Sequence, residues 1–168
     1  MSSGFENLRV LLADDNAHMR TIVAAVLKSI GVKHIRDASN GAEALTVMRE
    51  WQADVAMVDF RMQPIDGVEF TRLVRNAKDS VNPFLPIIML TGYADRSRVI
   101  DARDAGVTEL IVKPVTAQAV IARLNSVIFH PRPFVRTEDY FGPERRRTVS
   151  PEYGGPERRG TGKPAEEG

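Results

Sequence analysis

The sequence predicts an α/β domain over residues 1–129, built as a parallel sheet with helices on both faces, followed by a flexible tail over residues 130–168. Two observations predict the domain. Short runs rich in Val, Ile and Leu alternate with longer amphipathic stretches, and the runs are almost continuously apolar. Continuous apolar runs are typical of strands covered on both faces, and their alternation with helices is typical of βαβ units.

Five short runs are the predicted strands, and the second of them is the weakest. They span Leu8–Ala13, Lys33–Asp37, Asp54–Asp59, Leu85–Thr91 and Thr108–Lys113. Each is followed by a predicted helix, over Ala17–Ile30, Gly41–Trp51, Gly67–Lys78, Asp95–Ala105 and Thr116–Phe129. Asn16 is a suitable N-cap for the first helix and Gly31 a suitable stop. Asp95 and Thr116 are suitable N-caps for the last two helices. The domain therefore contains five βα units.

The composition narrows the function classes. The chain has no cysteine, which excludes disulfides, cysteine zinc sites and thiol nucleophiles and fits a cytoplasmic location. Residues 1–6 do not read as a signal peptide, and no apolar stretch approaches the roughly 20 residues of a membrane span. The formal net charge of +1 and the lack of a helix-turn-helix pattern predict no direct DNA binding.

The tail is marked by a change of composition near His130. Residues 130–168 hold six of the ten prolines and six of the twelve glycines, and the apolar pattern stops there. A motif, Tyr-x-Gly-Pro-Glu-Arg-Arg, occurs twice, at residues 140–146 and 153–159. An aromatic residue beside paired arginines can bind an acidic or phosphorylated protein surface. The alternative is a solvated low-complexity segment.

Polar side chains stand at the carboxyl ends of four predicted strands. The first strand ends at Asp14 and Asp15, the third at Asp59, the fourth at Thr91 and the fifth at Lys113. In open parallel sheets, binding sites form outside the carboxyl ends of the strands. Three carboxylates gathered there require a cation, and Mg²⁺ suits oxygen ligands. A carboxylate nucleophile, a lysine and a hydroxyl donor are also the groups that phosphoryl transfer uses.

Each of these residues also has an ordinary structural interpretation. Asp14 and Asp15 can cap the following helix, Asp59 and Thr91 can simply end strands, and Lys113 can be a solvated surface residue. Any one of these interpretations is reasonable for a single residue. The ordered set, with one member at each successive strand end, favours a reactive site.

This ordered set resembles the receiver domains of two-component response regulators, including the chemotaxis-type single-domain regulators. The resemblance spans residues 6–129. The matching segments are Leu11-Leu12-Ala13-Asp14-Asp15, Val58-Asp59-Phe60-Arg61-Met62, Leu90-Thr91-Gly92-Tyr93 and Val112-Lys113-Pro114. Thr91-Gly92-Tyr93 is also similar, in part, to an alphaproteobacterial subgroup marked by Thr-Gly-Tyr.

The resemblance implies a flavodoxin-like (βα)5 fold with sheet order 2-1-3-4-5. It implies that Asp59 accepts a phosphoryl group from a histidine kinase or a histidine phosphotransfer protein, and that the signal passes to a downstream protein target. Asp15, Asp59 and the backbone carbonyl of Arg61 would bind Mg²⁺, with Asp14 acting through a water. Thr91 and Lys113 would contact the phosphoryl oxygens. The chain would catalyse only its own phosphorylation and dephosphorylation.

Three further expectations come from the same resemblance. The Lys113–Pro114 peptide bond should be cis. The proline that often follows the Met after the acceptor stands one place late here, at Pro64, which alters the loop but spares the reactive set. Leu110 occupies the position where the family usually carries a Tyr or Phe that turns inward on phosphorylation. A rotating aromatic signal is therefore not expected at this position.

Three other functions fit the sequence less well. An aspartate-nucleophile phosphatase needs an acidic residue two places after the nucleophile, where this chain has Arg61. A nucleotide-binding domain needs a Gly-rich phosphate loop after a strand, and the sequence contains none. A receiver-like domain that acts only as an interaction module would not need the complete reactive set.

Overall fold

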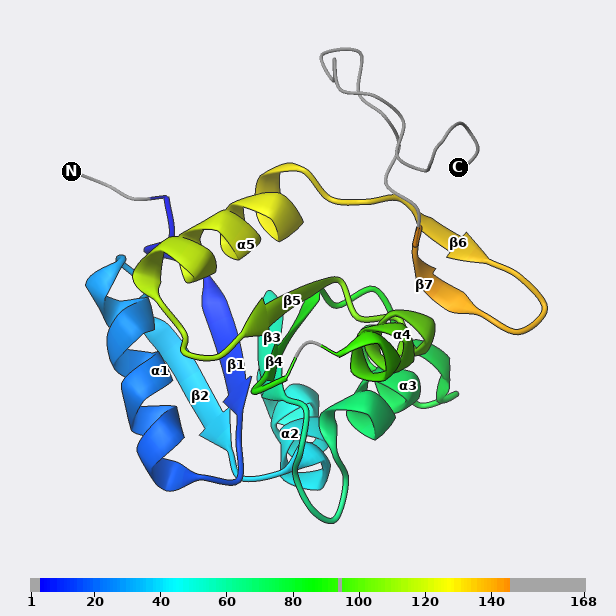
Figure 1. The fold of residues 1–168 in the computed structure, drawn as a ribbon, viewed down its shortest axis with the longest axis horizontal. Coiled ribbons are helices and arrows are strands. Elements are labelled where there is room, and N and C mark those ends of the chain that lie inside the picture. Colours follow the sequence, from blue (N-terminus) through cyan, green and yellow to red (C-terminus); the bar gives the residue numbers. More distant parts are fainter. Residues whose placement is uncertain (1–3, 94, 146–168) are drawn as a thin grey trace.

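A computed structural model describes residues 4–93 and 95–145. Five parallel strands form one sheet: β1 (Arg9–Ala13), β2 (His34–Ala38), β3 (Val55–Asp59), β4 (Ile87–Thr91) and β5 (Glu109–Val112). Their order is β2-β1-β3-β4-β5, which confirms the predicted flavodoxin-like winding. The helices are α1 (Ala17–Ser29), α2 (Gly41–Glu50), α3 (Gly67–Asn76), α4 (Arg96–Ala105) and α5 (Ala117–Phe129). Figure 1 shows α1 and α5 on one side of the sheet and α2, α3 and α4 on the other.

The alternation of side chains along each strand creates two cores. Successive residues of a strand point to opposite faces, so Val10 and Leu12 pack in one apolar cluster with residues of α1 and α5. Leu11 and Ala13 pack in the second cluster, with residues of α2, α3 and α4. All five residues of β3 and of β4 are buried. This explains why the predicted strands read as continuous apolar runs.

The predicted helix caps are confirmed. The side chain of Asn16 accepts a hydrogen bond from the Met19 N–H at 3.1 Å. Asp95 accepts from the Arg98 N–H at 2.9 Å, and Thr116 accepts from the Ala119 N–H at 3.1 Å. Gly31 has a φ of 107°, a conformation that favours glycine and ends α1. Within residues 4–93 and 95–145, no helix combines the length and apolarity that a membrane crossing requires.

The prediction of a flexible tail from residue 130 is wrong for residues 130–145. β6 (Phe134–Arg136) and β7 (Phe141–Pro143) form an antiparallel hairpin that packs beside α3, as Figure 1 shows. The rings of Phe134 and Phe141 contact each other and Phe84 in tilted or edge-to-face arrangements, at centroid distances of 5.1–5.5 Å. Two three-residue strands are not stable alone, so tertiary packing holds this hairpin. Residues 146–168 lie outside the described residues.

Residues of the first copy of the repeated motif hold this hairpin together. The hydroxyl of Tyr140 donates a hydrogen bond to the Pro143 carbonyl at 2.6 Å. Gly142 lies against the Tyr140 ring, where a Cβ atom would come within 2.7 Å of the hydroxyl oxygen. The Arg145 guanidinium lies 4.2 Å from the centre of the same ring and 2.9 Å from Asp104. In this copy, Tyr140 and Arg145 therefore serve intramolecular packing. The second copy, at residues 153–159, lies outside the described residues.

Arg75, in the last turn of α3, joins the hairpin to the domain. Its side chain is almost completely buried and donates hydrogen bonds to the carbonyls of Gly106, Pro83 and Leu85 at 2.7–3.0 Å. The Phe134 ring covers it, with the guanidinium carbon 4.9 Å from the ring centre. Burial lowers the pKa of Arg75 to about 10. Arg75 therefore ties together α3, the loops before β4 and β5, and the hairpin.

Candidate functional site

Three carboxylates meet at the carboxyl ends of β1 and β3. Oxygen atoms of Asp14, Asp15 and Asp59 all lie within 4.8 Å of one another. Asp14 and Asp59 are buried, whereas Asp15 is exposed. β1 and β3 are neighbours in the sheet, so their ends fall side by side. The structure therefore brings together the three acidic residues that the sequence placed at strand ends.

Lys113 supplies the positive charge of this cluster. Its ammonium nitrogen lies 2.6 Å from Asp59 Oδ1 and 3.8 Å from Asp14 Oδ2. The Lys113–Pro114 peptide bond is cis, as predicted, and Gln63–Pro64 is cis as well. Lys113 follows β5, two strands away from β3, so the long side chain reaches across the end of β4.

Asp14 has the least satisfied carboxylate. Its Oδ1 accepts a hydrogen bond from the Asn16 N–H at 2.9 Å, whereas its buried Oδ2 has no hydrogen-bond partner within the described part of the chain. Burial raises the pKa of Asp14 above its ordinary value, and the nearby Asp59 carboxylate adds to the rise. The Asn16 N–H and the Lys113 ammonium oppose it. A buried carboxylate oxygen without a hydrogen bond, beside two other carboxylates, fits a hard divalent cation such as Mg²⁺.

Gly67 allows α3 to begin directly against the end of β3. Its N–H donates to the Phe60 carbonyl at 3.1 Å. A Cβ atom at position 67 would collide with the backbone carbonyl of Asp59. Asp66 caps the helix by accepting from the Glu69 N–H at 2.8 Å. The local sequence Asp66-Gly67 therefore fixes how the loop after Asp59 returns to the core.

The Arg61 N–H donates a hydrogen bond to Asp59 Oδ2 at 3.2 Å. Together with Lys113 on Oδ1, it holds the Asp59 carboxylate at both oxygens. A basic residue, not an acid, follows Asp59 at the second position. The metal-binding role expected for the Arg61 carbonyl stays a prediction.

Thr91 is buried at the end of β4, beside β3. Its hydroxyl donates to the Tyr93 carbonyl at 2.8 Å and accepts from the Tyr93 N–H at 3.2 Å. In the observed arrangement it therefore bonds to its own loop. Leu110 lies in β5, partly buried against the apolar cluster of α2, α3 and α4, and brings no aromatic ring to this position.

Arg98 makes a contact near the carboxylate cluster that the sequence did not predict. The guanidinium of Arg98 lies over the rings of both Phe60 and Tyr93, at 5.1 and 5.0 Å from their centres. Arg98 is in the first turn of α4, well separated in sequence from Phe60. No local pattern marks this contact, because the fold alone brings α4 to the loop after β3.

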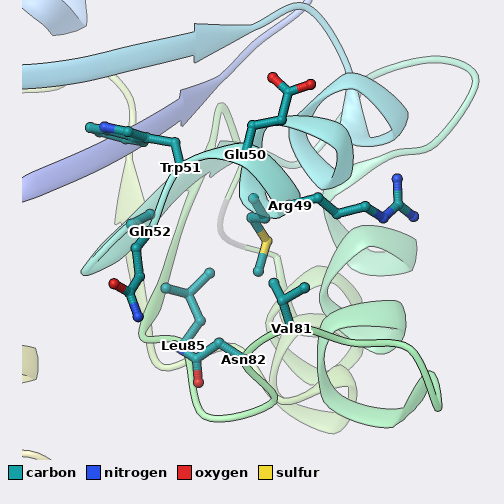
Figure 2. Close-up of a pocket in the computed structure, with 9 residues that line it drawn as sticks. Arg49, Glu50, Trp51, Gln52, Val81, Asn82 and Leu85 are labelled. Atoms are coloured by element: carbon teal, nitrogen blue, oxygen red, sulfur yellow. The ribbon is translucent and has the colours of Figure 1, made fainter.

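A surface cavity of about 560 Å³ lies elsewhere, between the end of α2 and the loop before β4. Figure 2 shows Trp51, Val81 and Leu85 among its lining residues. Ala53 and Leu85, which line it, precede β3 and β4, whereas Asp59 and Thr91 end the same strands. The cavity therefore lies at the opposite end of the sheet from the carboxylates and takes no part in this site.

The arrangement can support transfer of an anionic group to Asp59. The carboxylate is a nucleophile at the end of a rigid strand, and Lys113 and a bound cation can neutralise a group that carries several negative charges. Of the sequence-predicted site residues, Asp14, Asp15, Asp59 and Lys113 are in one cluster, and Thr91 ends the strand beside Asp59.

Known proteins resemble this chain in sequence and fold. Residues 10–125 match the family described as response regulator receiver domain. The chemotaxis protein CheY-3 of Vibrio cholerae is 31% identical over 122 residues, which cover 73% of this chain and 92% of that protein. The chemotaxis protein CheY of Pseudomonas aeruginosa is 31% identical over 120 residues, covering 71% and 95%.

The solved structure of chemotaxis protein CheY4 of Vibrio cholerae superposes with a TM-score of 0.66, at 30% identity, covering 72% of this chain and 98% of that one. A putative response regulator from Chloroflexus aurantiacus superposes with a TM-score of 0.67, at 28% identity, covering 74% and 100%. The family match over residues 10–125 spans the five-stranded sheet and ends before the hairpin. The chain therefore belongs to the response regulator receiver domain family.

Proposed function

We propose that this chain is a single-domain response regulator that accepts a phosphoryl group on Asp59, with Mg²⁺ bound, and passes the signal on by protein–protein interaction. The donor would be a histidine kinase or a histidine phosphotransfer protein. The observation that carries the proposal is the position of Asp59. Its Oδ1 lies 2.6 Å from the Lys113 ammonium nitrogen, and its carboxylate lies within 4.8 Å of those of Asp14 and Asp15. The partner that reads the phosphorylated state is a protein, and no direct DNA contact is proposed.

In the proposed step, a carboxylate oxygen of Asp59 forms a bond to phosphorus. The bond between phosphorus and the donor's leaving atom breaks, and the electron pair stays with the donor. Lys113 and Thr91 contact the phosphoryl oxygens. Asp15, Asp59 and the Arg61 carbonyl would hold Mg²⁺, with Asp14 acting through a water, and the bound ion would supply positive charge to offset that of the phosphoryl oxygens. Beyond its own phosphorylation and dephosphorylation, no turnover is proposed.

The direct test uses acetyl phosphate as a small-molecule donor with Mg²⁺ and intact mass as the readout. The wild-type chain is expected to gain one phosphoryl group, about 80 Da by its elemental composition, because Asp59 lies beside the Lys113 ammonium and beside the carboxylates that would hold Mg²⁺. Asp59→Asn should gain nothing. Asp101→Asn, which changes an exposed carboxylate on α4, is the matched control and should behave as wild type. Equal labelling of Asp59→Asn and wild type would sink the proposal.

Asp14 provides a test of the cation site that does not depend on phosphorylation. In EDTA, Asp14→Asn is expected to raise the midpoint of thermal unfolding by about 3–6 °C, because it removes a buried charge with one oxygen that has no hydrogen bond. Adding 10 mM Mg²⁺, about the excess needed for a millimolar site, should stabilise wild type and stabilise Asp14→Asn much less.

Asp101→Asn again serves as the control for the thermal experiment, and it should keep the full Mg²⁺ response. If Asp14→Asn responds to Mg²⁺ as strongly as wild type does, Asp14 is not part of the cation site. If Asp14→Asn is less stable than wild type in EDTA, the buried carboxylate contributes a favourable interaction that outweighs its burial.

A further inference from the structure

A single guanidinium connects the two loops that carry Asp59 and Thr91. Arg98 lies over the ring of Phe60, which directly follows Asp59, and over the ring of Tyr93, two residues after Thr91. Its side chain is 15% exposed, although it lies on the first turn of a surface helix. Asp95, which caps the same turn, lies 3.9 Å from it. The guanidinium is therefore held in place by two aromatic faces and by one carboxylate.

The hydroxyl of Thr91 is tied to the same loop. It has one hydrogen to donate, and in this structure it donates it to the Tyr93 carbonyl at 2.8 Å. The Tyr93 N–H donates back to the hydroxyl oxygen at 3.2 Å. Thr91 cannot donate to a phosphoryl oxygen until it releases the Tyr93 carbonyl. Phosphorylation therefore competes with the hydrogen bond that joins Thr91 to Tyr93.

We propose that Arg98 is a positioning residue that holds Tyr93, and through it the Thr91 hydroxyl, in the unphosphorylated arrangement. The proposal rests on the proposed function, since it assumes that Thr91 serves a phosphoryl group on Asp59. Stacking on Arg98 keeps the Tyr93 backbone where it accepts from Thr91. Stacking on Phe60 anchors Arg98 to the loop of the acceptor. The three side chains thus form a clamp, Phe60–Arg98–Tyr93, on the solvent side of the site.

The clamp gives this chain a switch that does not depend on an aromatic side chain in β5, where Leu110 stands. When Thr91 turns toward the phosphoryl group, the Tyr93 carbonyl loses its hydrogen bond from the Thr91 hydroxyl. Tyr93 is then held less firmly against Arg98. The start of α4 is then free to change position with the loop. Any interaction that stabilises only the unphosphorylated arrangement must, by linkage, weaken binding of the phosphoryl group.

The test measures binding of beryllofluoride with Mg²⁺, a noncovalent mimic of the phosphoryl group, by calorimetry. Arg98→Met keeps an unbranched apolar stem but removes the charge, so the clamp is lost. We expect its Kd for beryllofluoride to be about three- to tenfold lower than that of wild type, given the usual strength of cation–π contacts. Arg98→Lys keeps a cation above the rings and should stay within about twofold of wild type. Arg96→Ala, on the exposed face of the same turn, is the control and should not change the Kd.

A second readout reports on the clamp without any ligand. The Tyr93 N–H should exchange with solvent faster in Arg98→Met than in wild type, because its partner Thr91 is less firmly held. Unchanged or weaker beryllofluoride binding in Arg98→Met would overturn the role of Arg98, as would an Arg98→Lys variant that behaves like Arg98→Met. No binding by the wild-type chain would overturn the proposed function together with this inference. Equal binding by all variants overturns the inference alone.

Discussion

Arg75→Met is expected to lower the free energy of unfolding by about 3–5 kcal/mol, the largest stability effect of any single substitution considered for this chain. The guanidinium donates to three backbone carbonyls, those of Gly106, Pro83 and Leu85, at 2.7–3.0 Å. Met keeps an unbranched apolar stem but is shorter than Arg and has no donors, so the substitution leaves these buried acceptors without partners. Each buried, unpaired polar group costs about 1–3 kcal/mol.

The substitution should also loosen the hairpin. Phe134 lies over the Arg75 guanidinium, and Gly106, to which Arg75 donates, lies so near β7 that a Cβ atom at Gly142 would come within 3.1 Å of its Cα. Urea unfolding followed by far-UV circular dichroism measures the loss of stability. Arg72→Met, which changes a half-exposed arginine on the same helix, should lie within about 0.5 kcal/mol of wild type. A loss below about 1 kcal/mol for Arg75→Met would mean that water or a shifted loop replaces the lost donors.

Lys113→Met is expected to slow phosphoryl acceptance from acetyl phosphate about a hundredfold, a range typical of removing one charged group that stabilises a transition state. Its ammonium is the cation in direct contact with Asp59, at 2.6 Å. The phosphoryl group carries several negative charges as it approaches a carboxylate that is itself negative. Without Lys113, a bound cation alone must offset both, so the barrier rises even though the nucleophile is intact.

The rate of mass gain with acetyl phosphate and Mg²⁺ measures this effect. Lys78→Met, at an exposed lysine after α3, is the matched control and should react as wild type does. A Lys113→Met rate within about threefold of wild type would be too small a change for a charge that stabilises a transition state, and would reduce Lys113 to a partner of the resting carboxylates. Mg²⁺-induced thermal stabilisation, measured on the same variant, separates a loss of cation binding from a loss of phosphoryl contact.

Much of the fold and of the site follows from short-range features of the sequence. β3 and β4 are buried on both faces, so their residues before the terminal Asp59 and Thr91 are apolar, and this continuous apolar pattern predicts the strands from sequence. Asn16, Asp95 and Thr116 cap helices by bonds that span three residues, which local sequence encodes directly. Asp59 and Lys113 could be placed at one rim because parallel strands end at the same edge of a sheet.

The hairpin could not be predicted in this way. Its strands have three residues each, and β7 contains glycine and proline, so neither length nor periodicity marks them. What holds it is contact with distant parts of the chain. The Phe84 ring packs against the rings of Phe134 and Phe141, and Asp104 pairs with Arg145. The repeated motif was visible in the sequence, but the packing role of its first copy depends on where Asp104 and Gly106 lie.

By itself, then, the sequence determined the βα order, the helix caps and the group of reactive residues, because each depends on burial or on bonds between near neighbours. Only the tertiary structure decided that Asp14 keeps one buried oxygen without a hydrogen bond, that Arg75 is the buried centre of a backbone network, and that Arg98 joins the loops after β3 and β4. These features arise where segments far apart in the chain approach one another. No local pattern of residues records such contacts, since their free energy exists only in the folded chain.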